Sequence, residues 1–222
     1  MSDVIVIGSG FGGLATAIRL QAGGHQVHIV ERREKVGGRA YQLKDGGFTF
    51  DMGPSLITAP NLIDDIFAAA GRRTEDYVKI VPLDPFYRIF FDDGRLFDYS
   101  GDQERMEAEI RKFNPADVAG YRRFMAGIKT IYERAFADLA RQPFLKRADF
   151  LKILPELARL RAIRSVYDYV AGYISDPHLQ MVFSFHPLFL GGNPFRASSI
   201  YAIIPYLERL GGVHFAMGGM YS

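Results

Sequence analysis

The hydrophobic pattern at the start of the chain changes its period from one short segment to the next. Residues 4–7 form a continuous β-branched run, which is typical of a strand buried on both faces in a parallel sheet. Apolar side chains then recur at helical spacing over residues 14–20, and Gly23-Gly24 ends that helix. Residues 26–30 have the pattern of a second strand. This order predicts a βαβ unit with two parallel strands.

Two later segments have the pattern of β-hairpins. Asp45-Gly46-Gly47 separates residues 41–44 from residues 48–50, and Asp92-Asp93-Gly94 separates residues 88–91 from residues 95–99. Turn residues between alternating strands are the usual hairpin signal. We expect these strands to belong to a mixed or antiparallel sheet.

The segment from Asp102 to about Ala140 has a helical period. Within it, Asn114-Pro115-Ala116-Asp117 predicts a helix start, with Asn114 as N-cap and the proline at the first helical position. The chain as a whole is therefore predicted to be α/β, with a Rossmann-like βαβ unit, a mixed or antiparallel sheet and a helical subdomain.

Composition narrows the function classes. The 222 residues contain 27 Lys and Arg against 25 Asp and Glu, so no strong field favours nucleic acid as a partner. The absence of cysteine excludes disulfides, a thiolate nucleophile and Cys-ligated metals. The first residues lack the pattern of a signal peptide, and no apolar run is long enough for a spanning helix. A cytoplasmic location is expected.

The glycines between the first strand and the helix have the spacing of a dinucleotide fingerprint. Gly8, Gly10 and Gly13 form G-x-G-x-x-G, in which the glycines permit a tight turn, close approach of a pyrophosphate and close packing of helix and strand. Phe11 and Gly12 lie at the helix N-terminus, whose N–H groups attract phosphates. The alternative is a fold that has the turn without the ligand.

Glu31 ends the second strand, at about the 20-residue spacing that the fingerprint requires of its acid. A carboxylate at this position accepts hydrogen bonds from a ribose 2′-OH and repels a 2′-phosphate. FAD or NAD is therefore favoured over NADP.

The residues after Glu31 distinguish between FAD and NAD as the cofactor. Arg32 and the run Gly37-Gly38-Arg39 resemble the extension that follows the fingerprint in FAD-dependent amine oxidases and carotenoid desaturases. The resemblance implies that Gly37, Gly38 and Arg39 lie over the flavin end of FAD. The alternative is a glycine turn beside a surface arginine.

Further along, the similarity narrows to bacterial phytoene desaturases. The matching stretches are residues 47–58, 85–88, 113–118, 120–122 and 183–194. The first of them contains Gly53 and Pro54, which we expect at the cofactor site. The resemblance implies a flavoenzyme, peripheral to the membrane, that desaturates phytoene toward lycopene and passes electrons to a quinone or to oxygen.

Two alternatives to that activity stay open. One is another carotenoid or amine oxidoreductase, or an isomerase, of the same superfamily. The other is an inactive truncated fragment that binds only a nucleotide or a membrane, because the resemblance implies relatives about twice as long. The chain is then expected to be an N-terminal portion that lacks the segment returning to the FAD domain.

The expected domains follow from this resemblance. Residues 1–83 are expected to form a partial FAD-binding domain, and residues 84–113 part of the substrate domain. Residues 114–200 are expected to form the helical subdomain, a candidate for membrane association. Residues 201–222 are expected to start the return to the substrate sheet.

One segment of the helical subdomain is both basic and apolar. Residues 144–164 carry six basic side chains against two acidic ones, among many aliphatic and aromatic residues. Such a segment suits an anionic membrane surface, and we expect contacts from Lys146, Arg147, Lys152 and Arg159. The alternative is a helix pair packed on the core.

Desaturation of a hydrocarbon leaves few polar side chains as catalytic candidates, because the cofactor carries the chemistry. A carboxylate near the flavin could stabilise a cation-like transition state or accept the proton. Asp51 and Asp149 are weak candidates, and capping of a turn and of a helix, respectively, is the alternative for each. No metal site is expected, and His186 is interpreted as a buried, hydrogen-bonded histidine.

Overall fold

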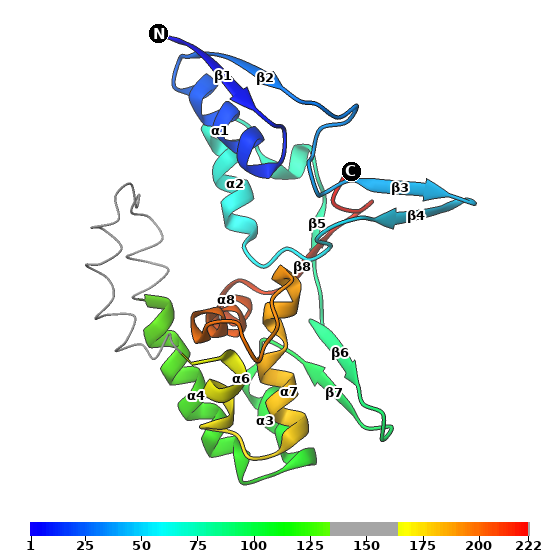
Figure 1. The fold of residues 1–222 in the computed structure, drawn as a ribbon, viewed down its shortest axis with the longest axis vertical. Helices are drawn as coiled ribbons and strands as arrows, with labels where there is room; N and C mark the ends of the chain where they lie inside the picture. The colour runs from blue at the N-terminus through cyan, green and yellow to red at the C-terminus, as the bar shows by residue number, and fades with distance from the viewer. Residues whose placement is uncertain (134–163, 222) are drawn as a thin grey trace. The chain divides into compact units, whose positions relative to one another are not determined.

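The computed structural model describes residues 1–133 and 164–221, which pack into two units (Figure 1). The first contains Met1–Leu83 and the chain from Gly211 onward, and the second contains Asp84–Leu210. The chain therefore passes from the first unit to the second after Leu83 and returns to the first at Gly211. The expected division into functional domains stays a prediction.

The first unit begins with the βαβ arrangement. Strand β1 (Asp3–Ile7) leads into helix α1 (Phe11–Ala22), and strand β2 (Gln26–Val30) pairs with β1 in parallel, with Asp3 opposite Gln26. Helix α2 (Pro60–Ala69) packs against α1 (Figure 1). The predicted strand, helix, strand order is confirmed.

The prediction that the first strand is buried on both faces is wrong. Ile5 is 68% exposed and Ile7 is 88% exposed, whereas Val4 and Val6 are partly buried. The described part of the chain forms only a two-stranded sheet here, and α1 covers one of its faces. A β-branched run thus identified the strand, but the run does not specify what packs on each side of it.

The remainder of the first unit consists of two antiparallel strand pairs. Strands β3 (Gln42–Asp45) and β4 (Phe48–Asp51) form the first predicted hairpin, in which Gly46 and Gly47 adopt φ of 55° and 82°. Strand β5 (Ile80–Pro82), which follows the short 3₁₀ helix η1 (Thr74–Asp76), pairs with strand β8 (His214–Ala216). The latter pairing joins segments far apart in the sequence.

The second unit combines one hairpin with helices. Strands β6 (Tyr87–Phe90) and β7 (Leu96–Tyr99) form the second predicted hairpin. The helices are α3 (Gln103–Phe113), α4 (Asp117–Tyr132), α6 (Val166–Ala171), α7 (Pro177–Ser184), η3 (His186–Leu190), η4 (Ser199–Ile203) and α8 (Ile204–Gly211). No helix in the described ranges is long and apolar enough to cross a membrane.

Side-chain caps start several of these helices. The Asp102 carboxylate accepts a hydrogen bond from the Arg105 N–H, and Asp176 accepts from the N–H groups of His178 and Leu179. Asn114 caps only the turn before α4, where its Oδ1 accepts from the Ala116 N–H at 3.1 Å. The helix itself begins two residues later than predicted, at Asp117 instead of Pro115.

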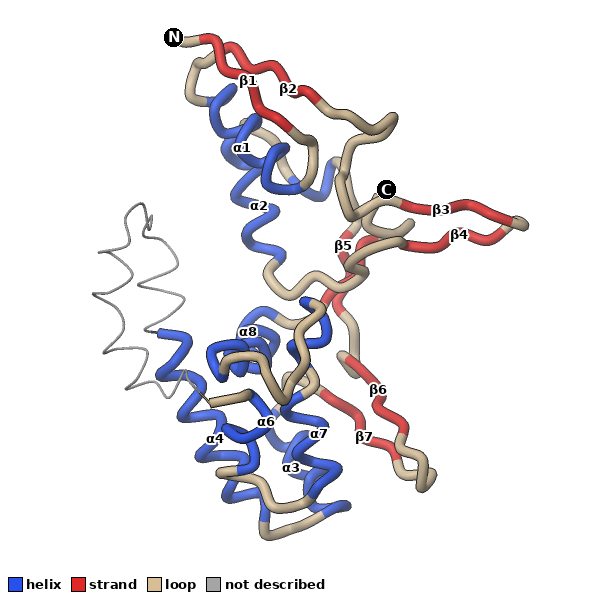
Figure 2. Tube along the Cα trace, in the orientation of Figure 1, coloured by secondary structure: helices blue, strands red, loops and turns tan. Residues whose placement is uncertain are grey.

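The core of the second unit is built from the helices and the inner face of the hairpin. Phe97, Phe124 and Phe183 have no exposed surface, and their rings lie within contact of one another or of Tyr99. Among the described residues, each strand pair forms its own two-stranded sheet (Figure 2). Both predicted hairpins are antiparallel, as expected, and in the described part of the chain they are not joined to each other in one sheet.

Candidate dinucleotide-binding site

The loop between β1 and α1 has a backbone that only glycine fits. Gly8 has φ of 95°, which residues with a side chain rarely adopt. A Cβ on Gly13 would lie 2.0 Å from the Gly8 carbonyl oxygen, so any side chain there would force helix and loop apart. The first turn of α1 therefore packs directly against the end of β1.

The N-terminus of α1 leaves backbone donors without a side-chain partner. Gly10 is the N-cap, with φ of −71° and ψ of 177°, and no side chain caps the helix. Phe11, the first helical residue, is 53% exposed. The first turn of a helix carries N–H groups with no intrahelical acceptor and the positive end of the helix dipole. This end can bind a phosphate group.

The Gly37-Gly38 segment lies against the fingerprint loop. The Gly37 N–H donates to the Ser9 carbonyl at 2.8 Å, and Gly10 and Gly37 form a parallel bridge. A Cβ on Gly38 would lie 2.9 Å from the Gly10 Cα. Gly37 and Gly38 have φ of 103° and 62°. The two glycine-rich segments that the sequence singled out are thus in direct backbone contact.

Glu31 is held by the same loop. Its Oε2 accepts hydrogen bonds from the Ser9 N–H at 2.8 Å and from the Ser9 hydroxyl at 2.7 Å, and its Oε1 accepts from the Arg33 N–H at 2.9 Å. These bonds, with that from the Ser9 hydroxyl as the largest influence, lower the pKa of the Glu31 carboxyl to about 2.

Ser9 and Arg33 belong to this arrangement, and the sequence argument missed both. Ser9 has no exposed surface, and the Arg33 Nη1 donates to the Gly38 carbonyl at 3.0 Å. A serine between the first two glycines, with a carboxylate at the end of the next strand, is the signal that could have identified the Ser9 contact. Arg32 and Arg39, which the sequence predicts as cofactor contacts, have exposed side chains, as does Arg33.

The backbones at Arg39 and Gly53 come together. A Cβ on Gly53 would lie 2.2 Å from the Arg39 carbonyl oxygen, so a residue with a side chain does not fit there. Pro54, next along the chain, is exposed. The structure therefore brings the end of the Gly37–Arg39 segment against the turn that follows β4.

Asp51 binds neither its own turn nor another titratable group among the described residues. The Gln42 Nε2 donates to its Oδ1 at 2.9 Å, and the Met220 N–H donates to its Oδ2 at 3.4 Å. The Gln42 amide also reaches the Gly218 carbonyl at 2.7 Å. Asp51 thus ties the β3–β4 hairpin to the end of the chain.

The other catalytic candidate and the expected membrane contacts lie outside the described residues. These are Asp149, Lys146, Arg147, Lys152 and Arg159.

The second unit contains a buried polar cluster of which the sequence indicated only His186. Glu208 and His186 have no exposed surface, and the His186 Nε2 lies 3.3 Å from the Glu208 Oε2 without an aligned hydrogen bond. The Tyr87 hydroxyl donates to the Glu208 Oε1. Burial, then the charge of Glu208, raises the pKa of Tyr87, so the phenol stays protonated. His186 is buried as predicted, but neither ring nitrogen makes a hydrogen bond.

One group in the described ranges has the composition of a metal site. Ligand atoms of Asp92, Asp93 and His178 lie within 4.8 Å of one another. The Arg95 Nε donates to the Asp93 Oδ2 at 2.7 Å, and its Nη2 lies 2.9 Å from the His178 Nδ1. A guanidinium therefore already supplies the positive charge at this hairpin tip.

Comparisons with known proteins show which family this chain resembles. Residues 11–222 match the flavin containing amine oxidoreductases. The chain is 51% identical over 219 residues to a lycopene-forming phytoene desaturase of Pantoea ananas, with 99% of this chain and 44% of that protein covered. It is 42% identical over 220 residues to a neurosporene-forming phytoene desaturase of Rhodobacter capsulatus, covering 99% of this chain and 42% of that protein.

Solved structures agree at the level of the fold. A putrescine oxidase bound to putrescine superposes with a TM-score of 0.62 at 19% identity, covering 99% of this chain and 47% of that one. The chain spans less than half the length of the curated relatives it matches. Because the family match extends over nearly all of its residues, the chain belongs to the flavin containing amine oxidoreductases.

Proposed function

We propose that this protein is part of an FAD-dependent desaturase that converts phytoene toward lycopene. The observation that carries the proposal is the 51% identity to a lycopene-forming phytoene desaturase, which extends over 99% of the chain. A 4,4'-diapophytoene desaturase of Staphylococcus aureus is also similar, at 34% identity over 221 residues. Both similarities favour a carotenoid substrate over an amine.

The described residues fit a dinucleotide. The α1 N-terminus has no side-chain cap, and Gly13 lets the first turn of the helix pack against the Gly8 carbonyl oxygen, where a Cβ would clash. In our proposal, the N–H groups of Phe11 and Gly12 bind the pyrophosphate, and the Glu31 Oε1 accepts a hydrogen bond from a ribose hydroxyl. Gly37, Gly38 and Arg39 lie beside the flavin end, with Gly53 and Pro54 behind Arg39. Ser9 and Arg33 orient the Glu31 carboxylate.

FAD, when bound, supplies the two-electron oxidation of the substrate's C–C bond. The substrate is a hydrocarbon without a group that the protein could polarise. The chain's own residues therefore have three tasks, which are to bind the cofactor, to align the substrate and to exclude water. Release of electrons to a quinone or to oxygen completes the proposed reaction.

Conversion of phytoene tests this function directly. Purified protein loaded with FAD is incubated with phytoene in liposomes, and the products are separated by chromatography with absorbance detection. The proposal predicts products with longer conjugated chains. Geometric isomers without oxidation would identify an isomerase instead, and turnover of an amine alone would identify an amine oxidase.

A pair of glycine variants links turnover to the proposed cofactor site. Gly13→Ala places a Cβ 2.0 Å from the Gly8 carbonyl oxygen, whereas at Gly23, at the other end of α1, the nearest atom is 3.4 Å away. We expect Gly13→Ala to abolish product formation and Gly23→Ala to retain it. Equal activity of the two variants would contradict the assignment of the loop.

We also propose that residues 144–164 attach the protein to an anionic membrane surface, as a peripheral protein on the cytoplasmic side. Each basic residue near such a surface contributes about 1 kcal/mol to binding. Lys152→Glu combined with Arg159→Glu is therefore expected to reduce co-sedimentation with anionic liposomes. Reversal of two exposed cations in the first unit, Arg19→Glu with Lys44→Glu, is the charge-matched control. Equal losses in both double variants would refute the assignment.

A further inference from the structure

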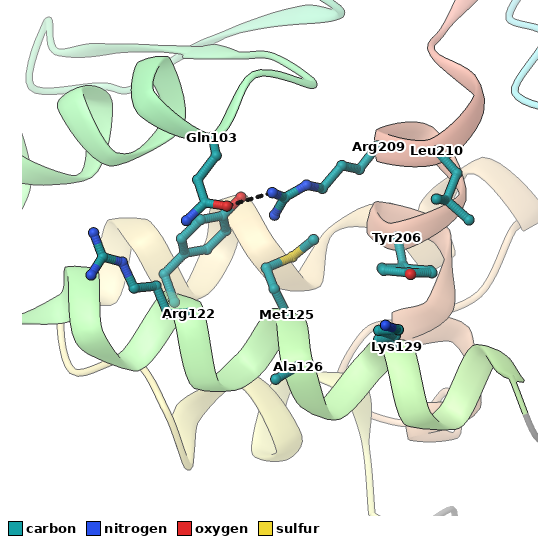
Figure 3. A pocket seen from close by; sticks show the side chains of 9 residues that line it. Gln103, Arg122, Met125, Ala126, Lys129, Tyr206, Arg209 and Leu210 are labelled. Atoms are coloured by element: carbon teal, nitrogen blue, oxygen red, sulfur yellow. Dashed lines mark hydrogen bonds between the residues drawn. The ribbon is translucent and has the colours of Figure 1, made fainter.

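A pocket in the second unit is lined by basic side chains without an acidic one. It has a volume of about 380 Å³ and is formed by α3, α4 and α8 (Figure 3). Among its described lining residues, the cations are Arg122, Lys129 and Arg209. The pocket lies apart from the glycine loop, which belongs to the first unit. None of the proposed cofactor contacts involves it.

The three cations differ in how far they are neutralised. The Arg122 guanidinium makes two hydrogen bonds of 2.7 Å to Glu107, so its charge is compensated. The Lys129 Nζ lies 3.7 Å from the Glu133 Oε1, and both side chains are more than half exposed, which makes this pair weak. Arg209 has no carboxylate partner in the described ranges, and its Nη2 donates to the neutral Gln103 amide oxygen at 2.5 Å.

Gln103 is held in the orientation that Arg209 requires. Its Nε2 donates to the Glu107 Oε1 at 2.9 Å, which leaves its amide oxygen directed toward the guanidinium. Figure 3 shows the Arg209 side chain extending from α8 toward Gln103. The guanidinium is therefore fixed at one end of the pocket, with further N–H groups available.

Tyr121 adds a buried donor at the same place. The residue is only 3% exposed, and it lines the pocket together with Arg209. Burial raises the pKa of Tyr121 to about 12, so the phenol keeps its proton at neutral pH. The O–H group can therefore donate its hydrogen to a ligand.

The pocket also has apolar lining residues, which are Met125, Tyr206 and Leu210, and Leu210 is 58% exposed. A ligand that matches both kinds of lining carries an oxyanion beside a hydrocarbon portion. Arg209 reaches the pocket from α8, whereas Lys129 and Tyr121 reach it from α4. Several donors on two helices suit the several oxygens of a phosphate better than the two oxygens of a carboxylate.

We propose that this pocket binds a phosphate group, with Arg209, Lys129 and Tyr121 as its ligands. The phosphate belongs either to a phospholipid headgroup, whose adjoining hydrocarbon contacts Met125 and Leu210, or to a free anion. The proposal is independent of the proposed desaturation, because it concerns binding at a second site.

Binding of defined probes by the purified protein tests the proposal. Calorimetry with inorganic phosphate and with glycerol 3-phosphate measures the free anion, and co-sedimentation with vesicles of phosphatidylglycerol or of phosphatidylcholine measures the headgroup. Residues 144–164 are also proposed to bind anionic vesicles, so vesicle binding assigns the phosphate to a lipid only where Arg209→Gln weakens it. Vesicle binding that Arg209→Gln leaves unchanged overturns the lipid assignment, and binding of the small anions assigns the phosphate to a free ligand. Absence of binding in every arm would overturn the proposal.

Variants then locate the binding. We expect Arg209→Gln to weaken binding of whichever probe the wild-type protein binds by about tenfold or more, as loss of a charge-assisted hydrogen bond implies. Tyr121→Phe keeps the buried ring and removes only the donor, so a smaller loss is expected. Arg123→Gln, an exposed cation on α4 outside the pocket, is the charge-matched control. Equal losses in Arg209→Gln and Arg123→Gln would mean general charge attraction and would overturn the site.

Discussion

Glu31 and Ser9 illustrate how single residues prepare the candidate dinucleotide site. Ser9 supplies two donors to the carboxylate, and the backbone N–H groups of Arg33 and Arg32 add further hydrogen bonds. These bonds favour the ionised form of Glu31 and hold it in one orientation. The site therefore combines a backbone cradle for phosphate with a preoriented acceptor, which reduces the entropy lost on binding.

The pKa of Glu31 gives a testable consequence at this scale. The folded value of about 2 lies below the ordinary 4.5, so the interaction stabilises the fold above pH 4.5 and is lost as the pH falls toward 2. Ser9→Ala removes the largest influence and is expected to raise the pKa, as measured by NMR titration of the carboxyl group. Glu31→Gln is expected to remove this contribution to the pH dependence of unfolding. An unchanged Glu31 pKa in Ser9→Ala would contradict the account.

The buried cluster of Tyr87, His186 and Glu208 in the second unit gives another testable consequence. Tyr87→Phe preserves the ring but deprives the buried Glu208 carboxylate of its donor. We expect the free energy of unfolding to fall by about 1–3 kcal/mol, the cost of an unsatisfied buried acceptor. Urea unfolding of Tyr87→Phe beside Tyr201→Phe, whose side chain is 43% exposed, measures the difference. Equal stability of the two variants would show that the hydrogen bond contributes nothing.

At the scale of elements, local patterns were sufficient for the βαβ order and for both hairpins. Those features depend on residues close in sequence, such as Gly46-Gly47 between two short strands. Contacts between distant segments were not predictable, because periodicity specifies a face and not its partner. The pairing of β5 with β8 and the Tyr87–Glu208 hydrogen bond are of this kind. The exposure of Ile5 and Ile7 is another example.

One close helix contact can be tested by substitution. A Cβ on Gly120 of α4 would lie 2.0 Å from the Tyr173 carbonyl oxygen, which follows α6. Gly120→Ala is expected to destabilise the fold by about 1–3 kcal/mol, because the backbone segments must separate. Thr130→Ala, at an exposed position of the same helix, is the control and is expected to cost little. Thermal unfolding compares them, and a Gly120→Ala variant as stable as Thr130→Ala would contradict the packing.

At the scale of the whole molecule, the candidate binding sites are divided between the two units. The first carries the glycine-rich cradle with Glu31, and the second carries the aromatic core, the buried Glu208 cluster and the basic pocket. The fingerprint was readable from sequence because two of its glycines, Gly8 and Gly13, are required by the local backbone. Ser9, Arg33 and the pocket residues were not, since their roles depend on side-chain contacts that no spacing rule describes.

Flavin retention tests the central claim most directly. Purified protein is mixed with FAD and desalted, and its absorbance and fluorescence spectra are recorded beside those of Gly13→Ala and Gly23→Ala. The account predicts bound flavin in the wild type and in Gly23→Ala, and its loss in Gly13→Ala, where the Cβ would lie 2.0 Å from the Gly8 carbonyl oxygen. Folded wild-type protein without flavin, or flavin retained equally by Gly13→Ala, would contradict it.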